Sequence, residues 1–255
     1  RSVGVERLRD WNNANYSRLR YQTDTKWNKG HLADQFVSYK EFVGDRLQRD
    51  ALTHNFVGDP VKDFYSLWET VNAWHKFGRY TSWFYIQTLK QCCDIPVDVD
   101  SLWLHDYSGS RSHRNGLCYA VGKEEWIDQK LDKTQIDFLE SKGWELRERT
   151  IEKYPHVAHL ADFFAMETAL CSFKKLFRRK SGRYLGYYLD RQAEEIRKVE
   201  ADNWEGIDWQ PMYQARSETV DDKYLVGSID KNLFNTFLDT GSFEPDRNSL
   251  SSYFA

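Results

Sequence analysis

The sequence predicts a mainly α-helical protein folded as a single domain. In several successive segments apolar residues recur at three- and four-residue intervals among charged ones, which is the periodicity of a helix with one buried face. Strand-like alternation is scarce across the 255 residues. No segment repeats with a period of about 20 to 50 residues, as a solenoid would require, and no low-complexity linker divides the chain.

The first third of the chain contains an N-terminal arm followed by helices. Residues 1–31 are rich in Arg, Asn, Trp and Tyr without clear periodicity, so we expect an irregular or partly helical arm there. Between residues 33 and 52 the apolar spacing predicts an amphipathic helix that bends at Gly44. Asp59 and Pro60 then match the N-cap and first position of another helix.

Two further helices are predicted before the middle of the chain. The helix that begins at Pro60 should stop near Gly78, because glycine is the preferred left-handed residue just beyond a helix end. A third helix should follow at once, from Arg79 to Cys92. Its large apolar residues cover most of its circumference, which is typical of a helix buried in a domain, and Pro96 lies beyond its end.

The second half of the chain predicts four more helices. They are expected over residues 124–141, 157–179, 184–201 and 229–238, with the one over 157–179 carrying the clearest apolar stripe. The Ser-rich end of the chain should be poorly ordered. The predicted organisation is therefore an arm over 1–31, a helical core over 32–239 and a flexible tail over 240–255.

Composition restricts the classes of function. A mean hydropathy of -0.75 and the absence of a long apolar run exclude a membrane span, so a cytosolic protein is expected. The net charge of -3 argues against indiscriminate binding of nucleic acid, which depends on many Lys and Arg contacts to phosphate. The four cysteines form no CxxC pair, so neither a zinc site nor a disulfide framework is indicated.

The most distinctive segment is the polar run over residues 106–117, DYSGSRSHRNGL. It has no apolar periodicity, so it predicts a loop. No acidic residue occurs from Tyr107 to Lys123, while arginine, serine and asparagine supply donors for hydrogen bonds. Arginine binds phosphate or carboxylate with two parallel bonds, and glycine lets the backbone approach a ligand closely. The segment therefore predicts a site for an anionic ligand.

A family resemblance rests on this segment and two others. Residues 109–117 (GSRSHRNGL), preceded by 77–82 (FGRYTS) and followed by 167–171 (ETALC), resemble the alpha-glutamyl/putrescinyl thymine pyrophosphorylases, most closely their clade 2. These are the amino acid:DNA transferases of bacteriophages. The resemblance covers roughly residues 60 to 200 of the chain.

The resemblance implies both a fold and a reaction. The fold would be related to the helix-hairpin-helix DNA glycosylases. The reaction would hypermodify thymine in phage DNA in the cytoplasm of the infected host: a partner kinase phosphorylates 5-hydroxymethyluracil in DNA, and the transferase then replaces phosphate or pyrophosphate with a free amino acid or polyamine. The partners would be double-stranded DNA containing modified thymine, the amine and the upstream kinase, and no membrane.

Several residues of the polar run are candidates for binding the leaving phosphate. Positive charge and neutral donors would stabilise the departing oxygens as they gain charge. The alternative is a structural loop whose arginines pair with surface acids. The phosphate-binding candidates are Ser110, Arg111, Ser112, Arg114 and Asn115.

Three residues are candidates for catalysis. Glu167 is the first candidate for the general base that removes a proton from the attacking amine, because a carboxylate beside an apolar stripe holds protons more tightly. His113 is the second. Asp106 would orient an Arg or His, or simply cap a turn. The alternative for Glu167 is a buried salt bridge with Lys174 or another basic side chain.

The start of the third helix is a candidate site for the amino acid. Free backbone N–H groups in a first helical turn attract anions, and the resemblance places this segment beside the active site. Arg79, with Tyr80 and Thr81, would bind the carboxylate of the incoming amino acid. The alternative is an ordinary salt bridge in the first turn of the helix.

A basic run near the end of the helix predicted over 157–179 is the candidate DNA surface. Cations are favoured at a helix C-terminus in any case, so a solvated helix end is the alternative. An enzyme that modifies a base inside a duplex must also flip it out of the stack. The DNA-binding candidates are Lys174, Lys175, Arg178, Arg179, Lys180 and Arg183.

The sequence contains none of the common motifs for a metal or a nucleotide cofactor. No HExxH, acidic metal pair, GxxxxGK[ST] or GxGxxG pattern occurs, so no metal and no nucleotide cofactor is expected. Loss of phosphate could be eased by transient addition of a nucleophile at C6 of the pyrimidine, and Cys118 or Cys171 is a candidate for that nucleophile. The better-supported alternative is that each cysteine is a small buried apolar side chain. A DNA glycosylase and a non-catalytic DNA-binding partner of the kinase are the competing functions.

Overall fold

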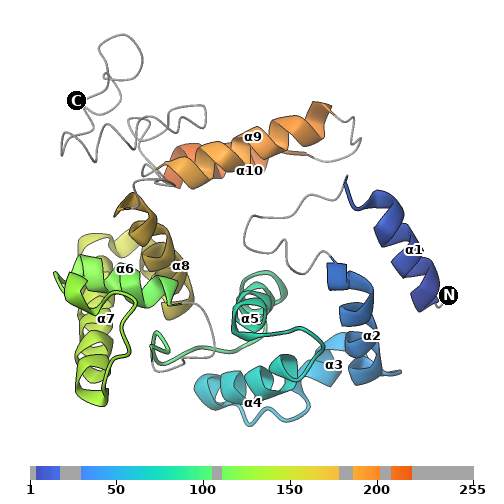
Figure 1. Ribbon diagram of the computed structural model, residues 1–255, viewed down its shortest axis with the longest axis horizontal. Coiled ribbons are helices and arrows are strands. Elements are labelled where there is room, and N and C mark those ends of the chain that lie inside the picture. Colours follow the sequence, from blue (N-terminus) through green and yellow to red (C-terminus); the bar gives the residue numbers. More distant parts are fainter. Residues whose placement is uncertain (1–3, 18–29, 105–110, 178–185, 202–207, 220–255) are drawn as a thin grey trace. The chain divides into compact units, whose positions relative to one another are not determined.

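The computed structural model describes residues 4–17, 30–104, 111–177, 186–201 and 208–219, and every regular element in these ranges is helical (Figure 1). The prediction of a mainly α-helical protein is confirmed for this part of the chain. Backbone contacts divide it into two compact units. Unit 1 comprises residues 1–111 and 128–168, and unit 2 comprises 112–127 and 169–255. A single domain stays a prediction.

Most of the helices belong to unit 1. Within it α1 packs against α2, α2 against α3, α3 against α4, and α4 against α5. The helix α8 begins in unit 1 and ends in unit 2. The elements of unit 1 are α1 (Val5–Asn15), α2 (Leu32–Val43), α3 (Gln48–Thr53), α4 (Pro60–Asn72), α5 (Arg79–Cys93), α7 (Lys133–Lys153), the 3-10 helix η3 (Pro155–Leu160) and the start of α8 (Phe163–Phe173).

Unit 2 contains the remaining helices. Within it α6 packs against η2 and η4. Its elements are α6 (Ser112–Ala120), η2 (Glu124–Trp126), the end of α8, η4 (Lys174–Phe177), α9 (Tyr187–Ala201) and α10 (Gln210–Thr219). No described helix in either unit is both long and apolar enough to cross a membrane.

The predicted helix start at Asp59 and Pro60 is confirmed. The Asp59 carboxylate accepts hydrogen bonds from the backbone N–H of Val61 and Lys62, and Pro60 occupies the first helical position. These bonds satisfy N–H groups that have no partner inside the helix. A local rule was therefore sufficient to place the beginning of α4.

The predicted end of α4 near Gly78 is wrong. The helix stops at Asn72, and Gly78 is instead the N-cap of α5, with an extended backbone. The left-handed residue in this connection is Lys76, with a φ of 59°. Trp74, which is buried against Tyr39 of α2, ends the helix earlier than the glycine signal indicated.

Three other predicted helices differ from the structure. The segment over 33–52 is broken rather than bent at Gly44, whose φ of 58° and ψ of -130° are incompatible with continuing α2. The helix predicted over 124–141 is replaced by η2 and by α7, which begins at Lys133 after a capping box made by Asp132 and Gln135. The segment over 157–179 is divided into η3, α8 and η4.

The ends of the chain are only partly described. The N-terminal arm contains α1, which agrees with a partly helical arm. The helix predicted over 184–201 corresponds to α9, beginning at Tyr187. The helix predicted over 229–238 and the tail over 240–255 lie outside the described residues.

The core of unit 1 is aromatic. Phe64 of α4 contacts Trp83 of α5, Phe164 of α8 and Trp103, with ring centroids 5.2–6.1 Å apart. Trp103 has a φ of 52°, which is unusual for a large side chain. Glu140 of α7 holds the backbone on both sides of it, because its carboxylate accepts from the N–H groups of Leu102 and Leu104 at 3.2 and 2.9 Å.

Gly116 sets how closely α6 and α8 approach in unit 2. A Cβ atom at this position would overlap the Leu170 carbonyl oxygen and lie 2.6 Å from its carbon. We expect Gly116→Ala to lower the free energy of unfolding by about 2 kcal/mol, because overpacking costs more than the gain in helix propensity. Urea unfolding followed by circular dichroism measures this change.

Gly143→Ala in α7 is the matched control. There the added methyl would lie 2.7 Å from Cδ1 of Leu102, which is the mobile end of a side chain rather than backbone. The gain in helix propensity should then leave stability within about 0.5 kcal/mol of the wild type. Equal losses in the two variants would contradict the role of backbone contact at Gly116.

Candidate functional site

A buried ion pair joins α5 to α8 in unit 1. Nη1 of Arg79, the first residue of α5, lies 3.2 Å from Oε1 of Glu167, and the two side chains are 1% and 6% exposed. The Arg79 guanidinium also lies 5.2 Å from the ring centre of Trp83, one turn along α5. The pair therefore holds a carboxylate and a guanidinium next to an aromatic ring and away from water.

Burial changes the proton affinity of Glu167. Loss of hydration raises the pKa of its carboxyl, while the charge of Arg79 and its hydrogen bond act in the opposite direction. The net effect is an upward shift of this pKa, because burial outweighs the attraction of Arg79. Glu167 is thus a carboxyl group with more than the usual tendency to hold a proton.

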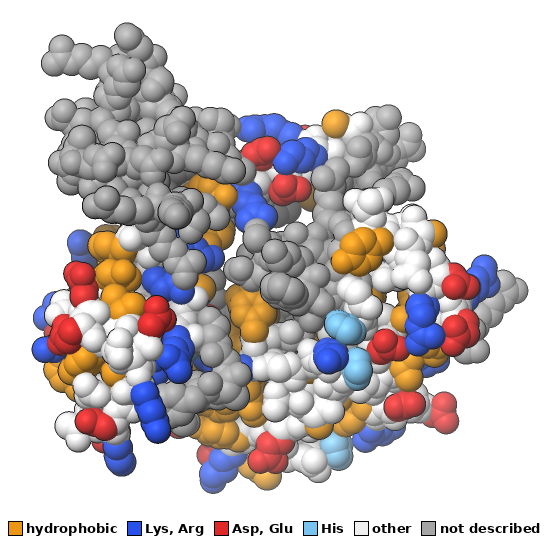
Figure 2. Space-filling view, viewed as in Figure 1, with side chains coloured by type: hydrophobic (Ala, Val, Ile, Leu, Met, Phe, Trp, Pro, Cys, Tyr) orange, Lys and Arg blue, Asp and Glu red, His pale blue; other side chains and the backbone are white. Residues whose placement is uncertain are grey.

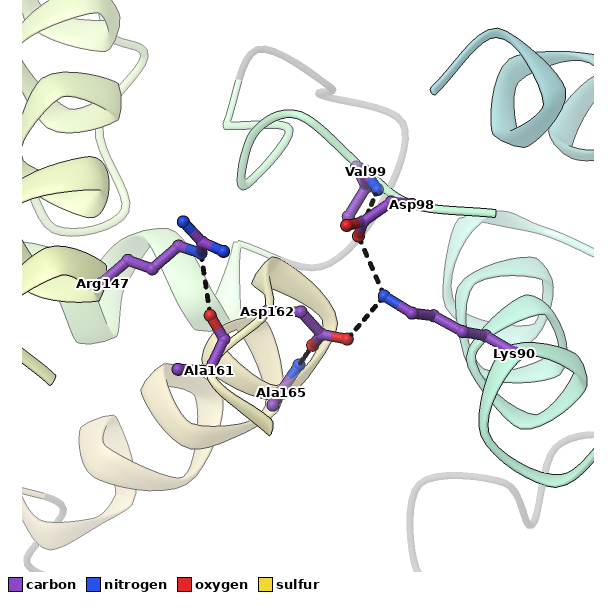
Figure 3. A network of polar contacts seen from close by, with 7 residues as sticks. All are labelled: Lys90, Asp98, Val99, Arg147, Ala161, Asp162 and Ala165. Carbon is purple, nitrogen blue, oxygen red and sulfur yellow. Dashed lines mark hydrogen bonds and ion pairs between the residues drawn. The ribbon is translucent and has the colours of Figure 1, made fainter. Parts of the chain in front are cut away.

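A second polar network links the same two helices (Figure 3). Nζ of Lys90 in α5 lies 2.8 Å from Asp162 and 3.0 Å from Asp98. The other oxygen of Asp162 accepts from the backbone N–H of Ala165 at 2.8 Å, which caps the first turn of α8. Lys90 and Arg79 therefore fix the start of α8 at two places along α5.

The structure brings together two of the candidate residues, Arg79 and Glu167, which are 88 positions apart in the sequence. Glu167 forms a buried salt bridge with the basic side chain of Arg79, as the alternative interpretation held. Tyr80 and Thr81 follow Arg79 and are half-buried, with Tyr80 packed on Phe84 at 4.7 Å. The roles of these residues in amino-acid binding and catalysis stay predictions.

The loop predicted over residues 106–117 is wrong for its second half. Residues 112–117 belong to the helix α6, in which His113, Arg114 and Asn115 are each no more than 3% exposed. The helix α6 has nine residues and is buried on most of its surface, so no side of it faces water. Apolar and polar residues therefore do not alternate with a helical period, and the sequence pattern did not predict a helix. The sequence predicted that glycine in this segment would let the backbone approach a ligand. In the structure Gly116 instead lets α6 approach the backbone of α8 closely.

Lys174 joins the predicted phosphate-binding residues of α6. Its Nζ lies 2.5 Å from Oγ of Ser112, and the residue is 7% exposed. The first turn of α6 contains no acidic residue. We call Ser112, Arg114, Asn115 and Lys174 the α6 basic cluster. It contains two buried cations, of which Lys174 lies at the N-terminus of α6, where an anion is favoured.

The remaining candidates are placed elsewhere or lie outside the described residues. Arg111 is exposed in unit 1, where its Nη1 donates to the backbone carbonyl of Asp128 at 2.7 Å. Lys175 of unit 2 contacts the hydroxyl and ring of Tyr188. Asp106, Ser110, Arg178, Arg179, Lys180 and Arg183 fall within ranges that the structure does not describe.

The network around Lys90 was not predicted from the sequence. Asp162 did carry a signal, because Asp directly before an apolar run is a common N-cap, but a longer helix was predicted across it. Lys90 and Asp98 carried none. Burial also raises the pKa of the Cys118 thiol to about 11, so this thiol matches the small buried residue that was the alternative to a nucleophile.

The raised pKa of Glu167 predicts how stability depends on pH. We compare the unfolding free energies of the wild type and of Glu167→Gln. The difference should favour the wild type at about pH 5, where the buried carboxyl still holds its proton. It should shrink as pH rises, because the carboxyl must then ionise in a buried place. Urea unfolding of both proteins at about pH 5 and about pH 8 measures the difference.

Glu145→Gln is the control of opposite sign. Lys142 and Arg149 lower the pKa of the half-buried Glu145 carboxyl, chiefly through a hydrogen bond from Lys142. Any preference for the wild type at this position should therefore grow with rising pH. The same slope for both positions would contradict burial as the cause of the shift at Glu167.

Comparisons with known proteins identify relatives of this chain. The family model described as "Amino acid:DNA transferase" matches residues 1–181. A protein named serinyltransferase, from Salmonella phage ViI, is 26% identical over 256 residues, which cover 92% of this chain and 62% of that protein. No solved structure matches the chain, so the relation to helix-hairpin-helix glycosylases stays a prediction.

The family match covers well over half of the chain. It includes α1 to α8 and both candidate clusters, Arg79 with Glu167 in unit 1 and the α6 basic cluster in unit 2. The phage relative extends the similarity over nearly the whole sequence. The chain therefore belongs to the amino acid:DNA transferase family.

Proposed function

We propose that the protein transfers an amino acid, through its amine, onto the 5-methylene carbon of phosphorylated or pyrophosphorylated 5-hydroxymethyluracil in DNA. The amine nitrogen forms a bond to that carbon, the carbon–oxygen bond to the phosphate breaks, and phosphate or pyrophosphate leaves with the bonding electrons. The family to which the chain belongs supports the transfer of an amino acid to DNA. The modified base and the leaving group are what the family resemblance of the sequence motifs implies.

The observation that carries this proposal is the α6 basic cluster. Arg114 and Lys174 are both buried cations, and Nζ of Lys174 lies beside the hydroxyl of Ser112, the first residue of α6. Donors fixed in advance stabilise charge that develops on a leaving phosphate more effectively than water, because they need no reorganisation. The cluster therefore suits the departing oxygens of the reaction.

Glu167 is the proposed general base. An amino acid attacks through its neutral amine, so the ammonium group must first lose a proton. Burial raises the pKa of the Glu167 carboxyl, which brings its proton affinity closer to that needed near neutral pH. Arg79, next to it, would bind the carboxylate of the incoming amino acid while keeping Glu167 oriented.

The proposal also includes the substrates, the cellular location and the DNA-binding surface. Serine is the first amino acid to test, because the phage relative is named a serinyltransferase. The DNA would be activated by an upstream kinase in the cytoplasm of the infected host. Lys175, with the arginines and lysines that follow it, is the proposed surface for the DNA backbone, and the target base would be flipped out of the duplex.

The direct test is a reaction with defined DNA. The protein is incubated with duplex DNA containing 5-phosphomethyluracil or its pyrophosphorylated form, together with serine or a pool of amino acids and polyamines. Mass spectrometry of the digested nucleosides should then show a thymidine adduct carrying the amine. Abasic sites would indicate a glycosylase, and DNA that is bound but unchanged would indicate a non-catalytic partner; either result contradicts the proposal.

Lys174→Met tests the role of the α6 basic cluster. The substitution keeps the length of the side chain but removes its charge, so we expect the transfer rate to fall about a hundredfold or more. Lys133→Met, at a lysine that is 87% exposed in unit 1, is the matched control and should retain full activity. Circular dichroism checks that both variants fold, and equal activity in the two would remove the cluster from the mechanism.

A further inference from the structure

Two histidines and an aspartate meet at the surface of unit 1, in a place that neither the sequence motifs nor the proposed reaction uses. One nitrogen of His31, one nitrogen of His75 and one carboxylate oxygen of Asp34 all lie within 4.8 Å of one another. Figure 2 shows histidine side chains close together near α2, with an acidic side chain beside them. Imidazole and carboxylate are the ligands that divalent zinc binds, together with thiolate.

The three residues are held by packed elements rather than by mobile ends. His31 is the N-cap residue of α2, and Asp34 lies one turn further along the same helix. His75 lies in the connection between α4 and α5, and its backbone N–H donates to Oγ of Ser38 in α2 at 3.0 Å. Trp74 fixes the same connection by packing on Tyr39 of α2 at 5.5 Å.

The geometry is close to that of a bound ion. The ring centres of His31 and His75 are 6.0 Å apart and their planes are inclined by 67°. Two imidazoles bound to one tetrahedral zinc have ring centres about 5 Å apart, given zinc–nitrogen bonds of about 2.0–2.1 Å. Small side-chain rotations would therefore bring all three ligand atoms to a single ion.

Arg9 prepares the carboxylate for this role. Its Nη2 lies 2.8 Å from Oδ1 of Asp34, so the ion pair holds the carboxylate in one orientation. A carboxylate can accept from a guanidinium on one oxygen and bind a metal through the other, and hydrogen bonds of this kind orient metal ligands.

We propose that His31, Asp34 and His75 bind a divalent zinc ion, with water as the fourth ligand. The ion would tie α2 to the connection between α4 and α5, and so strengthen the N-terminal part of unit 1. Because the site shares no residue with Arg79 and Glu167 or with the α6 basic cluster, it stands independently of the proposed transferase reaction. Its readouts are metal binding and stability rather than activity.

The test uses the full chain after treatment with a chelator. Calorimetric titration with zinc chloride should show one ion per chain with a dissociation constant in the micromolar range or lower. Zinc in about a hundredfold excess over that constant should raise Tm by about 5–10 °C. Cobalt in place of zinc should give the visible bands of a tetrahedral site without a thiolate charge-transfer band, because no cysteine belongs to this triad.

Variants assign the ion to these residues. His75→Gln changes an exposed side chain, so it should fold normally, weaken zinc binding at least about tenfold and abolish the rise in Tm. Asp34→Asn should have the same effect, while His156→Gln, at another exposed histidine, should bind zinc as the wild type does. Failure of the wild type to bind zinc, or unchanged binding in His75→Gln and Asp34→Asn, would overturn the proposal.

Discussion

Arg79 and Glu167 carry opposite charges in a place nearly closed to water, where their side chains are 1% and 6% exposed. A buried charge is costly unless another charge compensates it, so the ion pair constrains both side chains. This constraint fixes the N-terminus of α5 against α8, and Lys90 with Asp162 fixes a second point between them (Figure 3). The same burial that makes the pair necessary for the fold raises the pKa of Glu167, so stability and the proposed proton transfer share one cause.

In unit 2, close packing of the α6 backbone against α8 affects both the fold and the proposed phosphate site. Gly116 lets α6 lie against the Leu170 carbonyl, and this approach buries the polar residues on either side of the glycine. Arg114 and Lys174 are thereby held as fixed cations rather than as mobile surface charges. A phosphate that binds beside them would meet donors already in position, which is the condition under which electrostatic stabilisation of a leaving group is most effective.

Unit 1 contains a carboxyl group with raised proton affinity, and unit 2 contains the buried cations Arg114 and Lys174. The proposed amine transfer calls for one group that accepts a proton and one that stabilises an anion. The proposed zinc site has no part in this chemistry. It concerns only how α2 is attached to the rest of unit 1, in a protein whose buried core there is built largely from aromatic rings.

Capping and apolar spacing act within a turn or two of the chain, so local patterns were enough to predict the helical class, the N-cap of α4 at Asp59 and the start of α5 at Arg79. The same patterns also indicated that Arg79, Glu167 and the polar residues of α6 could belong to a site. Three features became known only from the folded protein: Glu167 pairs with a residue 88 positions away, residues 112–117 are helical, and His75 lies beside His31 and Asp34. A buried charge finds its partner through contacts between segments that are distant in the sequence. The end of α4, where Trp74 packs on Tyr39, depends on such contacts too. Local sequence patterns contain no information about them.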